Sequence, residues 1–154
     1  DWSLRDEYAD LLALTRTLLW LRREHPVFRQ RRYFEGRPVV DGARKDLAWF
    51  APSGREMTEN EWHDGSVRTI GMFLSGDGIR SRGPHGERIV GDSFLLWLHS
   101  GADPIDVTLP EDDWAQTYDV ALDTAGARTP QERHKAGDAV TIPARSCLLL
   151  RATS

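Results

Sequence analysis

The stretch FLLWLHSGADPIDVTLP, residues 94–110, decides the fold that we predict for this chain. Its first five residues are continuously apolar, which is typical of a central strand buried on both faces. Residues 105–109 alternate between apolar and polar side chains, so this run predicts a strand with one face in water. Gly101 and Pro104 lie between the two runs, and both residue types favour turns. We therefore expect a strand, a turn and a second strand in this stretch.

Short apolar runs separated by glycine and proline continue along most of the chain after residue 26. The expected strands are 32–34, 46–50, 69–74, 94–99, 105–109, 117–122, 139–142 and 147–151. Residues 148–150 are continuously apolar, as residues 94–98 are, so we expect both strands at the centre of a sheet. The five glycines between residues 76 and 91 predict a long loop or an irregular hairpin. The pattern predicts a mainly β fold, an antiparallel sandwich or barrel.

Residues 4–24 predict one amphipathic helix before the strands. An apolar stripe recurs every three or four positions at Leu4, Tyr8, Leu11, Leu14, Leu18 and Leu21. Ser3 and Asp6 have the spacing of a capping box, and Pro26 predicts the end of the helix. Each leucine left in water forfeits roughly 1.5–3 kcal/mol of burial free energy. We therefore expect the stripe to be covered by the sandwich or by a second copy of the chain.

The composition describes one domain of ordinary size, with 154 residues, 40% hydrophobic and 29% charged. The net charge of −4 argues against a nucleic-acid partner, which requires a dense basic face. No apolar run reaches the ~18 residues of a membrane span, so we expect no membrane partner. A single cysteine, Cys147, excludes a disulfide framework, and its apolar run predicts a buried thiol. Residue 1 is Asp rather than Met, so we expect the chain to be part of a longer protein.

No set of residues predicts a catalytic or metal site. His63, Asp64 and Gly65 are adjacent, but Asp-Gly favours a turn and no positioned nucleophile accompanies them. Acidic residues cluster at 59–64 and 111–113, in expected loops, where a solvated surface explains them. The five histidines lack the spacing that brings three or four ligands around zinc. We predict no catalytic residue, no metal and no cofactor.

The six tryptophans are the strongest sign of ligand binding, because an exposed indole stacks on the flat face of a sugar. Trp49 and Trp97 lie inside apolar runs, which predicts packing in the core. Trp62 and Trp114 follow acidic turns, so we expect them to be exposed. They are the candidate carbohydrate-binding residues.

Four segments in consecutive order resemble the bacterial glycogen-debranching enzymes of the isoamylase type. They are DWSLRDEYADLLALTRTLLWLRREHPVFRQRRYFEG (1–36), PSGREMTENEWHDGSVRTIGMFLSGDGI (52–79), GERIVGDSFLLWLHSGADPIDVTLP (86–110) and IPARSCLLLR (142–151). The combination of REMTENEW with GERIVGDSFLLWL is the specific part of the match. The resemblance spans nearly the whole chain.

The resemblance implies a parent enzyme of the α-amylase superfamily, glycoside hydrolase family 13, that hydrolyses α-1,6 branch linkages in glycogen or its limit dextrin. It implies that residues 1–26 are the last helix of the catalytic barrel and residues 27–154 a C-terminal β-sandwich. The family's nucleophilic aspartate, acid/base glutamate and second aspartate would lie upstream of Asp1. We therefore expect the chain alone to be inactive and its partner to be the parent barrel. The family and the single cysteine both fit the cytoplasm.

Three functions remain open at this point. In a debranching glycosidase, the domain would be non-catalytic, would stabilise the barrel and could border the substrate groove. As an autonomous carbohydrate-binding module, it would bind α-glucan or glycogen through Trp62 or Trp114. The third possibility is a purely structural domain with no ligand.

Overall fold

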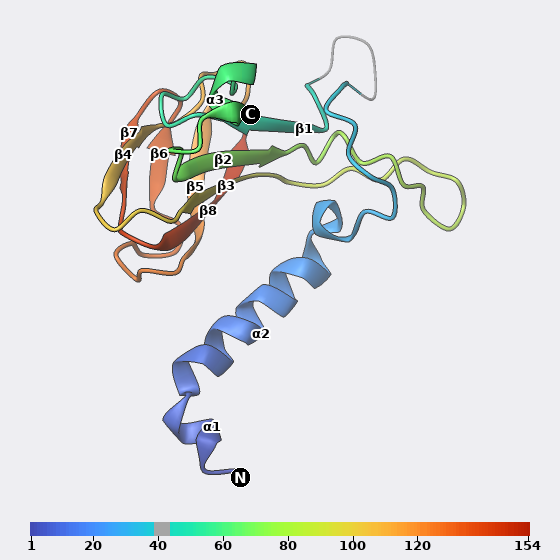
Figure 1. Cartoon of the computed structure of the whole chain (residues 1–154). Helices are drawn as coiled ribbons and strands as arrows, with labels where there is room; N and C mark the ends of the chain where they lie inside the picture. Colours follow the sequence, from blue (N-terminus) through green and yellow to red (C-terminus); the bar gives the residue numbers. More distant parts are fainter. Residues whose placement is uncertain (39–43) are drawn as a thin grey trace.

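The computed structural model describes residues 1–38 and 44–154 and is mainly antiparallel β, as predicted (Figure 1). The strands are β1 (Leu47–Phe50), β2 (Thr69–Leu74), β3 (Ser93–His99), β4 (Ile105–Thr108), β5 (Thr117–Asp123), β6 (Arg133–Lys135), β7 (Ala139–Ile142) and β8 (Ser146–Thr153). The helices are α1 (Leu4–Glu7), α2 (Ala9–Glu24), the short 3-10 helix η1 (Pro26–Arg29) and α3 (Glu59–His63). No helix within these described ranges is both long and apolar enough to cross a membrane.

The strands form two sheets that enclose a core. The larger has six strands in the order β1-β2-β3-β8-β5-β6, and the smaller pairs β4 with β7. All pairings are antiparallel. The continuously apolar strands β3 and β8 lie at the centre of the larger sheet, which confirms the prediction made from their composition. The antiparallel sandwich is therefore the fold that the sequence predicted.

The core between the two sheets is dense and apolar. Trp97, Phe50, Phe73 and Tyr118 are among its fully buried side chains. Gly71 on β2 makes room for the Trp97 ring, because a Cβ atom at this glycine would lie 2.9 Å from Cζ3 of Trp97. The Tyr118 hydroxyl donates a hydrogen bond to the Pro110 carbonyl, at 3.2 Å, so this buried polar atom is satisfied.

The strand expected at residues 32–34 is wrong, because these residues form no strand, and the residues that follow them are held by a buried carboxylate. Asp46 is fully buried and accepts hydrogen bonds from the backbone N–H groups of Glu35 (3.0 Å) and Arg37 (3.2 Å). It also accepts one from Nε of Arg80, at 2.9 Å. One buried side chain therefore fixes the backbone at Glu35 and Arg37, beside the single antiparallel bridge between Pro38 and Lys45.

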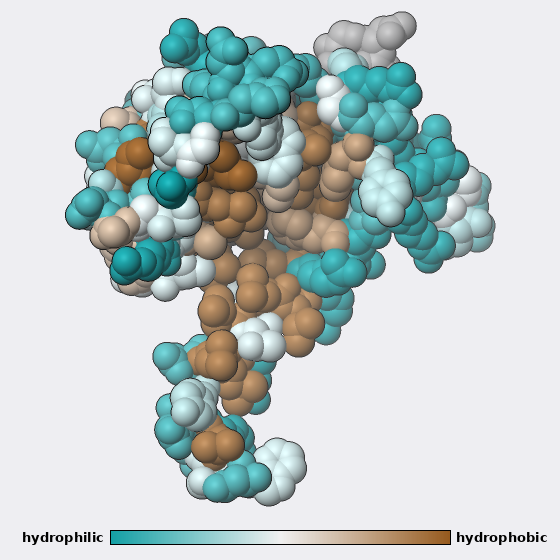
Figure 2. Space-filling model, viewed as in Figure 1, coloured by the Kyte–Doolittle hydropathy of each residue, from teal (hydrophilic) through white to brown (hydrophobic). Residues whose placement is uncertain are grey.

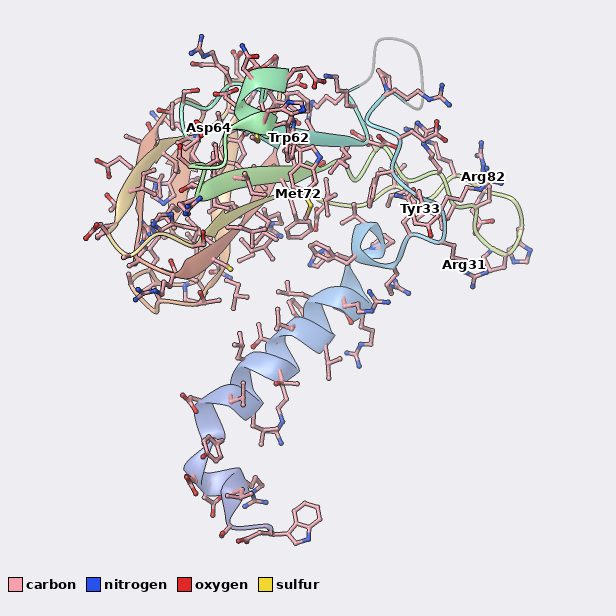
Figure 3. All side chains as sticks on the ribbon, viewed as in Figure 1. Arg31, Tyr33, Trp62, Asp64, Met72 and Arg82 are labelled. Atoms are coloured by element: carbon pink, nitrogen blue, oxygen red, sulfur yellow. The ribbon has the colours of Figure 1, made fainter. Side chains whose placement is uncertain are left out.

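Residues 76–91 form the irregular hairpin that their glycines predicted. Arg82 and Arg88 pair across it, and Figure 1 shows the hairpin extending away from the sandwich. The backbone N–H of Arg31 donates to Oγ of Ser81, at 3.2 Å, so the preceding segment runs along the hairpin. Arg31, Tyr33 and Arg82 lie on this extension (Figure 3).

The single helix expected over residues 4–24 is divided at Tyr8, whose φ of −112° and ψ of 40° are not helical. The predicted cap is also wrong: Oγ of Ser3 donates to the Asp1 carboxylate, at 2.7 Å, and makes no capping bond. The helix ends at Glu24, before Pro26, as expected. Only its last turn is anchored, since Leu21 and Val27 pack in a second apolar cluster against the larger sheet. Figure 1 shows the rest of α2 leaving the sandwich at a steep angle.

Candidate functional site

The most extensive candidate site is the outer face of the larger sheet, which points away from the sandwich core. Two rows of paired residues cross this face from strand to strand. The first row is Trp49, Met72, Leu96, Leu149 and Leu122, and the second is Ile70, Leu98 and Cys147. All except Leu149 are only half-buried. The sheet is therefore apolar on both faces, and its outer face is incompletely covered.

Helix α2 covers one part of this outer face and leaves a groove. Leu14, Leu18 and Leu21 line the groove from the helix. From the sheet it is lined by Leu96, Leu98, Leu122, Cys147 and Leu149. The groove has a volume of about 460 Å³, and apolar surface gathers between the helix and the sandwich in Figure 2. Leu18 remains 47% exposed although it faces the sheet, so the two surfaces do not close on each other.

A second side of α2, made of Leu12 and Leu19, is also apolar, and neither residue lines the groove. Leu19 is 63% exposed, whereas Leu11, which is 58% exposed, lies on the same side as Leu14 and Leu18. Successive helical residues are about 100° apart, so Leu12 and Leu19 lie on a different side from Leu14, Leu18 and Leu21. The helix therefore has two apolar sides, and the described structure covers one of them in part.

Trp62 is exposed, as its sequence neighbours predicted. Trp62 lies on α3, is 47% exposed, and its ring meets that of Trp49 edge-on, with 5.5 Å between centroids. A capping box fixes α3: Oγ1 of Thr58 accepts from the backbone N–H of Glu61, whose carboxylate accepts from the backbone N–H of Thr58 at 2.7 Å. Trp49 is half-buried on the outer face, so its assignment to the core is wrong. Figure 3 shows Trp62 at the edge of the sheet.

Trp114 does not present the exposed ring that its acidic neighbours predicted. It is half-buried, and its ring packs edge-on against Phe50 (5.0 Å) and Phe73 (5.1 Å). The turn at residues 111–113 stays exposed but folds this indole onto the edge of the core. The two candidate tryptophans therefore lie in different surroundings, with Trp62 on the outer side and Trp114 at the core. Trp97, by contrast, is fully buried, as predicted.

His63, Asp64 and Gly65 form the predicted turn at the end of α3. Nδ1 of His63 lies 2.7 Å from the Glu59 carbonyl oxygen, and the Asp64 carboxylate accepts from the backbone N–H of Ser66 at 2.8 Å. Hydrogen bonds from Ser66 lower the pKa of Asp64 below its usual value. These side chains are engaged with their own backbone and do not converge on a common point.

Other candidates for chemistry are few. Across residues 1–38 and 44–154, no cluster of three or more His, Cys, Asp or Glu residues could hold a metal ion. Cys147 is half-buried rather than fully buried, because its side chain lies on the outer face of β8. Burial raises the pKa of its thiol. This cysteine contributes apolar surface to the groove.

One polar group interrupts the outer face near the end of α2. Asp119 is 5% exposed and lies between Arg133 and Arg151 on the neighbouring strands. Its carboxylate accepts from Nε and Nη2 of Arg133, at 2.6 and 2.9 Å. These hydrogen bonds lower the pKa of Asp119, and the nearby charges of both arginines act in the same direction. The sequence offered no sign of this group, because its members are far apart along the chain.

The architecture is that of a β-sandwich domain attached to a helix, and it has a counterpart among solved structures. A pullulanase type I from Bacillus subtilis strain 168, complexed with maltose, superimposes with a TM-score of 0.60 at 17% identity. The match covers 100% of this chain and 17% of the pullulanase. At this identity the comparison establishes the fold, which is that of the β-sandwich domain of pullulanase-like enzymes.

Sequence comparison identifies the relatives. Proteins called glycogen operon protein GlgX homolog, from Mycobacterium tuberculosis and Mycobacterium bovis, are 43% identical over 99% of this chain. A glycogen debranching enzyme from Cronobacter sakazakii is 30% identical over 74% of it. No protein-family model matches. The chain spans 22% of the length of the mycobacterial relatives and is homologous to one segment of the bacterial glycogen-debranching proteins. The resemblance seen in the sequence is confirmed.

Proposed function

We propose that this chain is a non-catalytic domain of a glycogen-debranching glycosidase, and that its outer face and helix α2 dock on the catalytic part. The observation that carries the proposal is the apolar groove between α2 and the sheet, together with the second, uncovered side of the same helix. An apolar surface on two sides of one helix needs two partners. The sandwich supplies one of them.

The energetic argument favours a partner within the same polypeptide. Full burial of one leucine is worth roughly 1.5–3 kcal/mol relative to water. Leu11, Leu18 and Leu19 are each about half exposed, so a partner that covers them would contribute several kcal/mol. The relatives are much longer than this chain, which fills 22% of their length, so a large body is available for docking. Residues 1–26 would be the last helix of the catalytic barrel and residues 27–154 the sandwich.

The proposal includes inactivity of the chain alone. The groove is lined by no carboxylate, whereas glycoside hydrolysis uses two carboxyl groups that face each other across the substrate. Asp46 and Asp119 are buried and form ion pairs with Arg80 and Arg133. The hydrolytic residues would belong to the remainder of the enzyme, which acts on α-1,6 linkages in the cytoplasm.

A chimera tests the docking. The segment of the Mycobacterium tuberculosis relative that aligns with this chain is replaced by the chain itself, and thermal unfolding and reducing-sugar release from glycogen are measured. We expect one cooperative transition and activity in the chimera, and no activity from the chain alone. The double variant Leu11→Ser/Leu19→Ser should separate the unfolding of the two parts, whereas Arg16→Ser, a matched change at an exposed polar position of α2, should not. A double variant that unfolds like the parent chimera would refute docking through the helix.

A second candidate function is an autonomous carbohydrate-binding module. The half-exposed ring of Trp62, supported edge-on by Trp49, favours it. The packing of Trp114 against the core weakens its part in such a site. Titration of the chain with maltooligosaccharides, followed by tryptophan fluorescence in the parent and in Trp62→Ala, tests this function directly.

A further inference from the structure

A pocket lies where the end of α2 meets strands β5 and β8. Its volume is about 190 Å³, and Trp20 and His25 line it from the helix end. Asp119 and Arg151 line it from the sheet, and Gln131 closes it from the turn before β6. Leu21, on the side of α2 that faces the sheet, also lines the pocket, whereas Trp20 points about 100° away from Leu19. Leu19 does not line the pocket, so docking through Leu19 would use a different surface.

The floor of the pocket is a carboxylate and guanidinium pair held in place by the sheet. Asp119 and Arg151 are paired residues of β5 and β8, and Nη2 of Arg151 lies 3.5 Å from Oδ2 of Asp119. Arg133 holds the carboxylate from the other side. Because Asp119 is buried and ionised, it offers fixed acceptor oxygens beside fixed N–H donors.

The walls of the pocket are an aromatic ring and a polar turn. Trp20 is 51% exposed, and its ring meets that of His25 edge-on, with 6.1 Å between centroids. The His25 ring packs on Phe94, at 4.8 Å, and its Nδ1 is 3.1 Å from Oδ2 of Asp92. Gln131 holds a left-handed φ of 71°, fixed by a 2.8 Å hydrogen bond from its N–H to the Val120 carbonyl. A rigid backbone therefore carries an exposed amide at the rim.

We infer that this pocket binds one glucosyl unit of an α-glucan, with the sugar ring against Trp20 and its hydroxyl groups on Asp119, Arg151 and Gln131. A pyranose has an apolar face that suits an indole and neighbouring hydroxyl groups that both donate and accept. A carboxylate next to a guanidinium complements such a pair of hydroxyls. The carboxylates of Asp119 and Asp92 balance the guanidiniums of Arg133 and Arg151, so the charges suit a neutral ligand. The choice of α-glucan among sugars rests on the proposed function.

The experiment titrates the intact chain with maltotetraose and follows backbone amide shifts by NMR. We expect saturable shifts at residues around Trp20, Asp119 and Gln131 at millimolar sugar. Trp20→Ala should weaken binding about tenfold, the loss expected when one stacked ring is removed. Gln131→Gly, which tolerates the left-handed backbone and removes the side chain with its amide, should weaken binding by a smaller factor. Trp2→Ala, which removes an exposed ring that does not line the pocket, is the matched control and should bind like the parent chain.

The results separate this site from the other proposals. Absence of saturable shifts, or full affinity in Trp20→Ala, overturns the pocket assignment. Loss of binding in Trp62→Ala alone also overturns it and places sugar binding on α3. Equal shifts with cellotetraose, the β-linked isomer, contradict the α-glucan assignment. None of these outcomes alters the chimera experiment, whose failure would instead refute the docking of the outer face.

Discussion

The interior of the sandwich and the outer face of its larger sheet are made by the same strands but differ in how far their side chains are buried. On β3, Leu95 and Trp97 point inward and are fully buried, whereas Leu96 and Leu98 point outward and are only half-buried. The inner side chains meet the β4 and β7 sheet. The outer side chains, Leu96 and Leu98, line the groove that lies between the sheet and helix α2. The comparison shows a domain whose core is fully buried and whose outer face is partly exposed.

The difference explains why continuously apolar strands are needed here. An antiparallel sheet with one wet face would alternate, as β4 does with Ile105, Asp106 and Val107. Strand β3 does not alternate, so both of its faces must be shielded from water. Within the described structure only the inner face is fully shielded. The sequence pattern and the exposure of the outer residues both agree with the docking that we propose for this face.

The largest expected effect is on the free energy of unfolding, when one tryptophan from each region is replaced by alanine. Trp97→Ala empties the fully buried centre of the core and should lower the free energy of unfolding by about 3–5 kcal/mol, which can unfold the domain outright. Trp62→Ala removes a half-exposed ring and should cost about 1 kcal/mol or less. Urea denaturation of both variants measures the contrast. Similar losses in the two would mean that the outer face is as complete as the core.

The next effect concerns Asp46, which organises the segment leading from α2 to the sheet. Asp46→Ala leaves the Arg80 guanidinium and two backbone N–H groups without their acceptor and should cost about 2–3 kcal/mol. Asp77→Ala, on the exposed part of the hairpin, is the control and should have little effect. Urea denaturation at neutral pH gives both values.

The same carboxylate gives stability a defined pH dependence. Burial by itself would raise the pKa of Asp46, but hydrogen bonds from Glu35, Arg80 and Arg37 outweigh it and hold the pKa below 3.8. A carboxyl group with a lower pKa in the folded state stabilises the fold above its unfolded pKa, and this contribution is lost as the pH falls through the folded value. The wild-type chain should lose stability below about pH 4, and Asp46→Asn should lose less over that window. An unchanged acid dependence in the variant would contradict the role of Asp46.

A smaller effect is expected at Gly71, where the inner face of β2 has no room for a side chain. In Gly71→Ala the added Cβ would lie 2.9 Å from the Trp97 ring and 3.1 Å from Cβ of Phe50, so we expect a loss of about 1–3 kcal/mol. Gly65→Ala meets no atom within 4 Å and serves as the control, with a change of roughly 0.5 kcal/mol or less. Thermal unfolding of both variants measures the difference. A neutral Gly71→Ala would show that the core is looser than its geometry indicates.

The smallest effect on stability is expected at two exposed leucines of α2. Leu11→Ser/Leu19→Ser should change the stability of the isolated chain by about 0.5 kcal/mol or less, because neither side chain is buried in it. If the parent chain forms dimers through its leucines, the variant should be monomeric in light scattering. A large loss of stability in a monomeric sample would mean that these leucines pack within the chain.

Patterns along the chain were enough to predict most strands and the central places of β3 and β8. Strand β6, with the polar sequence Arg-His-Lys, was missed because it has no apolar alternation. Helix α3 carried a signature that was overlooked, since Thr58 and Glu61 have the spacing of a capping box. The break at Tyr8 and the unused Ser3 cap were not predictable from spacing alone.

The candidate sites were predicted less well than the fold, for a physical reason. The groove and the Trp20 pocket depend on strand order and on where α2 ends against the sheet. These relations join residues more than a hundred positions apart, such as Leu18 with Leu149 and Trp20 with Arg151. Local patterns do not contain them. Trp114 shows the same limit, because the core that covers it is made of distant strands.

Hydrogen exchange of α2 tests the incomplete outer face most directly. Amide exchange is measured in the isolated chain and in the chimera with the mycobacterial relative. We predict rapid exchange in the first turns of α2 and strong protection in β3 and β8 of the isolated chain, with α2 becoming protected in the chimera. Protection of α2 in the monomeric chain that equals that of β3, and does not increase in the chimera, would contradict the proposal that this helix and the outer face are a docking surface.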